Sequence, residues 1–361
     1  MRIALDVTYA SPRERYGIGV YSAQLARALA RIDRENLYHL CYRPSYLLRG
    51  GQTLRVPQPN FHTWLLQDPF NWLLARRVDI FHSLNLRLPR RRFRCEVVTL
   101  HDVYALTERV YATEEFRRTF GRLTREVVVR AHHLIVPSNY LKDEVRRSCG
   151  VLEEKISVVP LGVDIDEQVP DAEAVSALQR AIGHSGPLLL AVGSIERRKN
   201  LTNVARALRA LPDEVRLLQV GGLGFGAEEV LRAIEEAGVR DRIIRLGYLP
   251  PTEMRKIYRL ATVLVFPSLE ETFGLPVLEA MAAGLPVVTS HGSALPEAAG
   301  ESALLVDPEN PEEIAAAVRR ILESPELRAE LIRKGRQRAR EFPWERTAGE
   351  TLAVYERLTS R

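Results

Sequence analysis

Residues 267–290 read Pro267-Ser-Leu-Glu-Glu-Thr-Phe-Gly-Leu-Pro-Val-Leu-Glu-Ala-Met-Ala-Ala-Gly-Leu-Pro-Val-Val-Thr-Ser290. The apolar run 263–266 just before them predicts a buried strand, and the stretch itself predicts a loop, a short helix and a second strand. Pro276 suits a first helical turn and Gly284 a helix C-terminus, so we expect the helix to cover 276–283. Strands that alternate with helices in this way are typical of parallel α/β sheets.

The loop before this helix predicts an anion site. The first N–H groups of a helix have no intrahelical partner and carry the positive end of its dipole. Backbone donors at Thr272, Phe273, Gly274 and Leu275 can therefore bind a diphosphate, and Gly274 lets the backbone approach it closely.

Two acids bracket the predicted anion site, Glu271 in the loop and Glu279 in the helix. A carboxylate repels phosphate but accepts hydrogen bonds from hydroxyl groups. We therefore interpret Glu279 as an acceptor for ribose hydroxyls and Glu271 as a contact to a second sugar. An equal alternative is that Glu279 only favours the helix N-terminus and that Glu271 is a solvated loop charge.

These residues resemble the donor-site motif of the retaining glycosyltransferases of family four. The motif is an acid, seven residues and a second acid, here Glu271 to Glu279, followed by Ala280-Met-Ala-Ala-Gly-Leu-Pro-Val-Val288. The resemblance implies an α/β protein of the GT-B fold, with two Rossmann-like parallel-sheet domains facing across a cleft. It also implies that the second acid binds the nucleotide ribose, while the first acid and the loop amides hold the donor sugar.

Length and composition limit the number of domains and the setting of the protein. A chain of 361 residues suits two domains, and 46% hydrophobic residues suit globular cores. No apolar run reaches the roughly 18 residues that span a bilayer. Three dispersed cysteines without a CxxC pair predict a reduced, cytoplasmic setting.

Positive charge is concentrated in the first half of the chain. The formal net charge is +5, and residues 1–165 hold 26 of the 51 Lys and Arg but only 17 of the 46 Asp and Glu. This asymmetry predicts an anionic partner, either membrane lipid at the inner membrane face or a phosphorylated acceptor. The arginines at 87–94 are the densest cluster, and a merely solvated loop is an equal alternative. We expect no nucleic-acid partner.

The first half predicts a doubly wound sheet. Strands are expected at 2–7, 37–42, 78–82, 95–100, 133–137 and 156–159, with helical segments between them. Ligands of such sheets bind beyond the strand C-terminal ends, where Gly17 and His101 lie. The pair Gly17 and Gly19 lets a phosphate or sugar approach, although a turn alone would also explain it.

The resemblance implies that the glycine matching Gly17 lies near the donor phosphate or the acceptor. It also places a histidine at the strand end occupied by His101, close to the donor sugar. Its imidazole can donate to a sugar hydroxyl or help with charge at the anomeric centre, and a loop histidine is the alternative.

A second phosphate-binding segment follows the strand expected at 187–192. It reads Gly193-Ser-Ile-Glu-Arg-Arg-Lys-Asn200. Arg198 and Lys199 can clamp a diphosphate, the lysine as a point charge and the arginine as a fork. The family commonly has its arginine directly after the glycine, where this chain has Ser194. Lys199 therefore matches the lysine of the family, while the arginine that binds the diphosphate would be Arg198 or Arg197.

The remaining expectations concern the nucleotide base, metals and cofactors, and the domain boundaries. The resemblance implies that backbone groups at Gly247 and Tyr248 meet the nucleotide base. The triplet Asp164-Ile-Asp166 satisfies a short acidic metal pattern, but it stands in a linker without further ligands. We therefore expect no metal and no cofactor. Residues 1–168 form the expected acceptor-side domain and 169–343 the donor domain, with a helix at 344–361 packing back on the first.

The predicted reaction is retaining transfer of a hexose from a nucleotide-diphosphate sugar, with GDP-mannose favoured, to a hydroxyl of a lipid-linked or polysaccharide acceptor. His101, Glu271, Arg198 and Lys199 form the predicted catalytic set, in which Glu271 positions the sugar and the two cations stabilise the leaving diphosphate. The alternatives are a transferase that uses UDP-glucose or UDP-N-acetylglucosamine with a small soluble acceptor, and a nucleotide-sugar epimerase.

Overall fold

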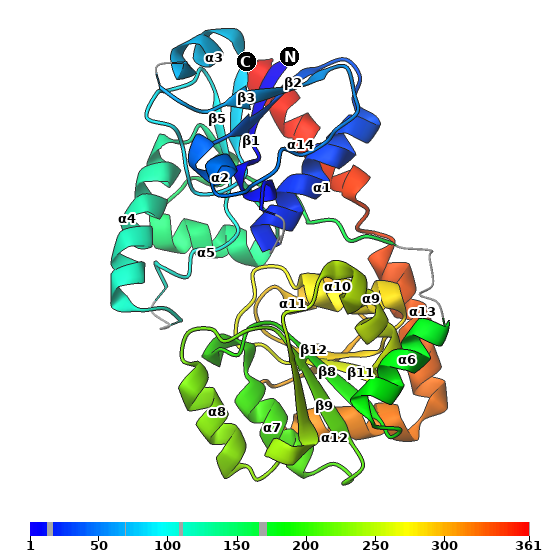
Figure 1. The fold of residues 1–361 in the computed structure, drawn as a ribbon. Coiled ribbons are helices and arrows are strands. Elements are labelled where there is room, and N and C mark those ends of the chain that lie inside the picture. The colour runs from blue at the N-terminus through cyan, green and yellow to red at the C-terminus, as the bar shows by residue number, and fades with distance from the viewer. Residues whose placement is uncertain (13–16, 69, 108–110, 166–171, 361) are drawn as a thin grey trace. The chain divides into compact units, whose positions relative to one another are not determined.

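The structure, a computed structural model, describes residues 1–12, 17–68, 70–107, 111–165 and 172–360 (Figure 1). It divides the chain into two compact units. The first comprises Met1–Gly162 and Trp344–Arg361, and the second comprises Val163–Pro343. Asp166 and the predicted boundary after residue 168 lie outside the described residues.

The chain passes from one unit to the other at two neighbouring places. Gly162 lies so close to Trp344 that a Cβ at position 162 would be 2.5 Å from the indole ring. Val163 N–H donates to the Phe342 carbonyl at 2.8 Å. The first unit therefore ends at Gly162, and Val163 hydrogen-bonds within the second unit.

The first unit is built on seven parallel strands among the described residues, in the order β3-β2-β1-β4-β5-β6-β7. This order reverses direction between β1 and β4, as in doubly wound sheets. The strands are β1 (Arg2–Asp6), β2 (Leu37–Tyr42), β3 (Phe61–Leu65), β4 (Ile80–Ser83), β5 (Glu96–Thr99), β6 (His133–Val136) and β7 (Ile156–Val158). Its helices are η1 (Thr8–Ala10), α1 (Gly17–Ile32), α2 (Pro44–Leu48), α3 (Asn71–Arg77), α4 (Glu114–Arg130), α5 (Asn139–Cys149), η2 (Glu153–Lys155) and α14 (Trp344–Thr359).

Strand β3 was not predicted. It pairs with β2 and is the edge of the sheet, and none of its five residues is fully buried. Its sequence Phe-His-Thr-Trp-Leu lacks the continuous apolar run that marks a strand covered on both faces. The pattern on which the other strands were predicted was therefore missing here.

Helix α14 belongs to the first unit although it follows the second in the sequence. It packs against α1, and Figure 1 shows the two side by side. Trp344, Ala348, Val354 and Tyr355 of α14 join the buried core formed by α1 and strands β1, β2 and β4. This core is therefore closed by residues at the far end of the chain.

The second unit has six parallel strands among the described residues, in the order β10-β9-β8-β11-β12-β13. They are β8 (Leu188–Val192), β9 (Arg216–Val220), β10 (Ile243–Gly247), β11 (Val263–Phe266), β12 (Val287–Ser290) and β13 (Leu304–Val306). Its helices are α6 (Ala172–Ile182), η3 (Arg197–Lys199), α7 (Leu201–Arg209), α8 (Ala227–Glu236), η4 (Arg240–Arg242), α9 (Pro251–Leu260), α10 (Leu275–Ala283), α11 (Leu295–Ala299), α12 (Pro311–Glu323) and α13 (Pro325–Ala339).

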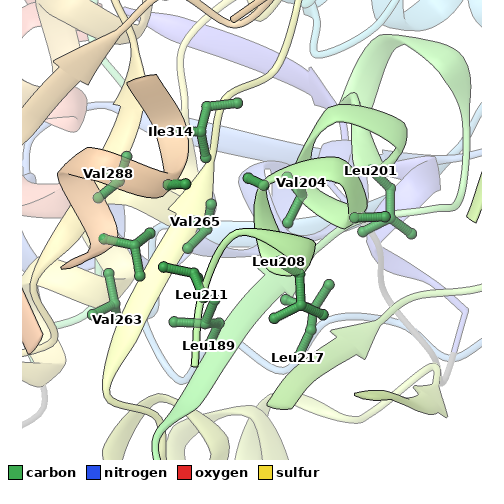
Figure 2. Packing of buried hydrophobic residues seen from close by; sticks show 14 of the residues in the cluster. Leu189, Leu201, Val204, Leu208, Leu211, Leu217, Val263, Val265, Val288 and Ile314 are labelled. Atoms are coloured by element: carbon green, nitrogen blue, oxygen red, sulfur yellow. The ribbon is translucent and has the colours of Figure 1, made fainter. Parts of the chain in front are cut away.

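The core of the second unit lies between its sheet and helices α7 and α12 (Figure 2). Leu201, Val204 and Leu208 recur at helical spacing on α7, so their side chains share the face that meets the sheet. Leu189 of β8 and Leu217 of β9 pack against them, and each is at most 1% exposed. This packing fixes the C-terminal ends of the strands, where the candidate site lies.

The prediction of two parallel α/β domains is thus confirmed. In the described part of the chain, no helix is both long enough and apolar enough to cross a bilayer.

Candidate active site

The candidate site lies at the C-terminal edge of the second sheet, where the strand order reverses between β8 and β11. Such switch points are the usual ligand sites of doubly wound sheets, because the loops after the two strands run to opposite faces. Here the two loops are tied together, since Leu269 N–H donates to the Arg198 carbonyl at 2.9 Å. The charged residues of both loops therefore meet.

Four charged side chains form a compact cluster between these loops. Glu271 Oε1 lies 2.5 Å from Lys199 Nζ and 3.0 Å from Arg198 Nη1. Arg198 Nη2 lies 2.6 Å from Glu196 Oε1. All four side chains are less than a fifth exposed. The structure thus brings the three predicted catalytic residues of this unit together, whereas Arg197 is exposed.

The cluster sets the charge states of its members. Burial alone would raise the pKa of Glu271, but the positive charges of Lys199 and Arg198 outweigh burial and hold the pKa below its ordinary value. Burial also lowers the pKa of Lys199, and the charge of Glu271 opposes that effect. Two cations therefore lie beside two carboxylates in partly desolvated surroundings, where a bound anion would interact strongly with them.

Local backbone geometry holds Lys199 in place. Gly193 has φ +125°, and a Cβ there would lie 3.0 Å from Lys199 Cε, so glycine leaves room for the lysine side chain. Asn200 adopts the left-handed conformation with φ 59°. Its amide donates to the carbonyls of Pro267 at 2.9 Å and Pro308 at 2.7 Å. These contacts fix the loop just before helix α7 begins.

Helix α10 points its N-terminus at the same region of the sheet edge. It begins at Leu275, one residue earlier than predicted, with Pro276 in its first turn and Gly274, which has no side chain to form a cap, at the N-cap position.

Gly274 has a packing role that the sequence did not indicate. It has φ +99°, and a Cβ at this position would lie 2.8 Å from Leu295 Cδ2 of α11, so glycine is needed here for its conformation and for packing. Phe273, next to it, is buried with its ring against Phe342.

Glu279 is held by a tyrosine from the neighbouring helix α9. Tyr258 Oη donates to Glu279 Oε2 at 2.8 Å. Burial raises the pKa of Glu279, and Asp164 adds to this effect while the tyrosine bond opposes it. Glu279 is thus a half-buried, oriented acceptor rather than a solvated helix charge.

The remaining predicted donor contacts also follow strands of this sheet. Ser194 is exposed, just after β8. Gly247 ends β10 with φ +66°, and its carbonyl accepts from Gly221 N–H at 2.8 Å. Tyr248 is 37% exposed. Thr272, in the loop before α10, and Leu275, the first residue of α10, are half-buried. All these residues therefore lie near the C-terminal ends of parallel strands.

Gly17 and His101 belong to the first unit. Gly17 begins α1 with φ +29°. His101 follows β5, and its Nε2 lies 3.1 Å from the Leu84 carbonyl. Burial lowers the pKa of His101 to about 4, so the ring is neutral at pH 7. A carbonyl only accepts, hence Nε2 carries the proton and Nδ1 is an acceptor. In this tautomer Nδ1 can accept a hydrogen bond from a sugar hydroxyl but cannot donate one.

Three contributors to the second-unit site were missed. Glu196 reads as one more loop charge, and Tyr258 as an ordinary apolar position of a helix. Only Asn200 carried a signal, since asparagine before a helix is among the few residues that tolerate the left-handed conformation.

Comparison with known proteins is consistent with this geometry. The model of the family described as Glycosyl transferases group 1 matches residues 178–338, and that of Glycosyltransferase Family 4 matches residues 16–167. The chain is 30% identical over 313 residues to the O-antigen chain mannosyltransferase B of Escherichia coli, covering 85% of this chain and 80% of the relative.

Two further proteins complete the comparison. The D-inositol 3-phosphate glycosyltransferase of Xylanimonas cellulosilytica is 32% identical, covering 83% of this chain and 72% of the relative. The solved sucrose-phosphate synthase of Thermosynechococcus elongatus has a TM-score of 0.80 at 24% identity, covering 100% of this chain and 99% of that one. That likeness confirms the predicted GT-B fold. The chain is an enzyme that transfers glycosyl groups, and it belongs to the group 1, family 4 glycosyltransferases.

Proposed function

We propose that this glycosyltransferase moves a hexose from a nucleotide-diphosphate sugar, GDP-mannose first among them, to a hydroxyl of a lipid-linked or polysaccharide acceptor with retained anomeric configuration. One observation carries the proposal. Lys199 and Arg198 converge within 3.0 Å of Glu271 at the switch point of the second sheet. A diphosphate that enters there would meet two cations already gathered at one place.

The proposed roles follow from these contacts. Lys199 and Arg198 turn from Glu271 to the diphosphate and stabilise the charge that grows as the sugar leaves. Glu271, freed from part of its pairing, accepts hydrogen bonds from sugar hydroxyls and positions the sugar. We assign no covalent nucleophile, so the acceptor attacks the face from which the diphosphate departs. The two cations supply the charge stabilisation, and the proposal includes no metal.

The other end of the donor is proposed to lie along α10. Glu279 accepts from the ribose hydroxyls, and the backbone at Gly247 and Tyr248 meets the base. His101 of the first unit offers Nδ1 as an acceptor for a sugar hydroxyl, and Gly17 lies near the phosphate or the acceptor. GDP-mannose is favoured because the loop 193–200 resembles that of mannosyl transferases and because a curated relative is an O-antigen chain mannosyltransferase.

A donor panel tests this proposal. Slow hydrolysis of GDP-mannose, UDP-glucose and UDP-N-acetylglucosamine is measured with and without EDTA, and we expect GDP-mannose to be consumed fastest in both conditions. Faster consumption of a UDP-sugar would overturn the choice of donor, and loss of activity in EDTA would overturn the metal-free mechanism. Glu279→Gln should weaken binding of GDP and UDP in calorimetry, and an unchanged affinity would contradict the ribose role.

A small soluble acceptor is the second candidate. It is favoured by the relative described as a D-inositol 3-phosphate glycosyltransferase, which is 32% identical. Transfer from the preferred donor to inositol phosphate, compared with transfer to a lipid-linked saccharide, distinguishes the two. Product formed only with the soluble acceptor would replace the first proposal.

We also propose that the first unit binds an anionic membrane surface through helix α4. Arg118, Arg122 and Arg125 recur at helical spacing and are all exposed. Arg130 ties the arginine-rich loop 90–94 to the same helix, since it donates to the Pro89 and Arg91 carbonyls at 2.6 and 3.0 Å and pairs with buried Glu96. The helix and the loop therefore form one basic surface.

Vesicle sedimentation tests the membrane proposal. The unmodified protein should bind phosphatidylglycerol vesicles and not phosphatidylcholine vesicles, because each basic group near an anionic surface contributes about 1 kcal/mol. Replacement of Arg118, Arg122 and Arg125 by Gln should release it, whereas the same change at the exposed Arg209 and Arg232 should not. Equal retention of both variants would contradict the proposal.

A further inference from the structure

Four buried polar side chains form a continuous line through the core of the first unit. Tyr355 of α14 lies 2.5 Å from His82 Nδ1, and His82 Nε2 lies 2.8 Å from Thr99 Oγ1. Tyr21 of α1 completes the line, with its hydroxyl 3.0 Å from the same Thr99 Oγ1. The four residues come from four elements: α14, β4, β5 and α1.

None of these groups can meet a substrate, because none is more than 3% exposed. Polar groups in a core cost free energy unless every one is hydrogen-bonded, and apolar residues of similar size would pack there without that requirement. These four hydrogen-bonded side chains therefore stabilise the unit little more than apolar residues would. Their hydrogen bonds instead fix the orientation of each side chain.

Two members of this line of side chains, Tyr21 and His82, lie beside the groups that contact His101. The Tyr21 ring meets the His101 imidazole edge to face, with ring centroids 4.8 Å apart and an interplanar angle of 76°. Thr99, which fixes the Tyr21 hydroxyl, precedes His101 by two residues on the same segment. His82 precedes Leu84 by two residues, and the Leu84 carbonyl accepts the His101 Nε2 proton at 3.1 Å. Each support of His101 is therefore anchored by a member of the chain.

We propose that Tyr21 is a positioning residue for His101, and that the hydrogen bonds from Tyr355 through His82 and Thr99 fix the Tyr21 side chain beside it. This inference rests on the proposed role of His101 at the donor sugar. A neutral imidazole offers a lone pair in one direction only, so rotation of the ring or exchange of its tautomer removes the acceptor. The Tyr21 ring blocks rotation from the side, and the Leu84 carbonyl selects the tautomer.

The hydrogen bonds that join these four side chains can all run in one direction, from Tyr355 to Tyr21. His82 is neutral because burial lowers its pKa to about 3, so one ring nitrogen donates and the other accepts. If Tyr355 Oη donates to Nδ1, Nε2–H donates to Thr99 Oγ1, whose own hydroxyl proton turns to Tyr21. Helix α14 thus contributes to the orientation of His101 through Tyr355.

The test is Tyr21→Phe, which keeps the ring and removes the hydroxyl. We expect kcat to fall roughly fivefold, the rate change that corresponds to one neutral hydrogen bond, with the donor KM unchanged. Nitrogen NMR should show His101 protonated at Nε2 in the unmodified protein and as a mixture of tautomers in the variant. Tyr355→Phe should give the same changes, smaller in size.

Tyr38→Phe is the matched control. It removes a hydroxyl from a fully buried tyrosine of the same core, where the group donates to Asp33 and has no connection to His101. We expect a loss of stability at least as large as in Tyr21→Phe, because the lost bond is to a carboxylate, with kcat and the His101 signals unchanged.

The outcomes separate this inference from the proposed function. If His101→Ala transfers sugar at the unmodified rate, the proposed role of His101 fails. If His101→Ala is slow, but Tyr21→Phe matches Tyr38→Phe in kcat and leaves the His101 nitrogen signals unaltered, the positioning role is overturned.

Discussion

Lys199→Ala separates catalysis from folding at the candidate site. The ammonium group lies 2.5 Å from Glu271 and its side chain is only 16% exposed. If it stabilises the departing diphosphate, its removal should lower kcat by roughly 10²–10³, as for other preorganised groups that contact charge developing in the transition state. The donor KM should change less than kcat, because this charge is largest in the transition state.

The effect on stability should be small by comparison. Loss of one partner from a buried ion pair typically costs about 3–5 kcal/mol when the remaining charge is uncompensated. Here Arg198 stays 3.0 Å from the same Glu271 oxygen, so we expect a loss of roughly 1–2 kcal/mol. Urea unfolding measures this loss, and initial rates of nucleotide release at saturating acceptor measure kcat.

Lys256→Ala is the control for this experiment. Lys256 pairs with Glu253 at 2.7 Å on the surface of α9, and its side chain is 30% exposed. This substitution removes the same charge from the same unit, and the rate should not change. The reasoning about the diphosphate would be refuted by a Lys199→Ala enzyme that turns over as fast as the Lys256→Ala enzyme.

Three further predictions concern pH and packing. Tyr258→Phe removes the hydrogen bond that lowers the pKa of Glu279. Calorimetry from pH 4.5 to 7.5 should therefore show that nucleotide binding is lost at a higher pH than in the unmodified protein. Coincident profiles would contradict this. Gly274→Ala combines a strained φ with a clash and should cost roughly 2–4 kcal/mol in urea unfolding, whereas a stable variant would mean that the backbone adapts. Burial lowers the pKa of His82 to about 3 and of His101 to about 4, so below pH 6.5 the unfolded chain binds protons that the folded chain does not. These two histidines should together reduce the free energy of unfolding by roughly 3–4 kcal/mol between pH 7 and pH 5, and an equal stability at the two pH values would contradict their burial.

The parts of the fold that could be predicted are those whose signals are local. Pro276 and Gly284 bound α10 because a fixed φ suits a first turn and a left-handed residue ends a helix, whatever surrounds them. Glu271 and Glu279 were found for the same reason, since their spacing is a property of one short segment. Strand β3 was missed because exposed edge residues need not form an apolar run.

The parts that could not be predicted depend on contacts between distant segments. Nothing in α9 indicates that Tyr258 meets Glu279, and the need for glycine at position 274 comes from a leucine on another helix. The sequence does not show whether Arg197 or Arg198 meets Glu271, because this contact depends on the path of the loop. The tautomer of His101 likewise follows from a carbonyl seventeen positions away.

The late position of α14 in the chain has a consequence for biosynthesis. Domains usually fold in the order in which they leave the ribosome. The core of the first unit, however, includes Trp344 and Tyr355, which are translated after the whole second unit. The second unit is contiguous in sequence, so it can complete its core during translation. The core of the first unit cannot be completed until α14 has been synthesised. A premature stop codon just before residue 344 would thus harm the domain translated first and leave the later one able to fold.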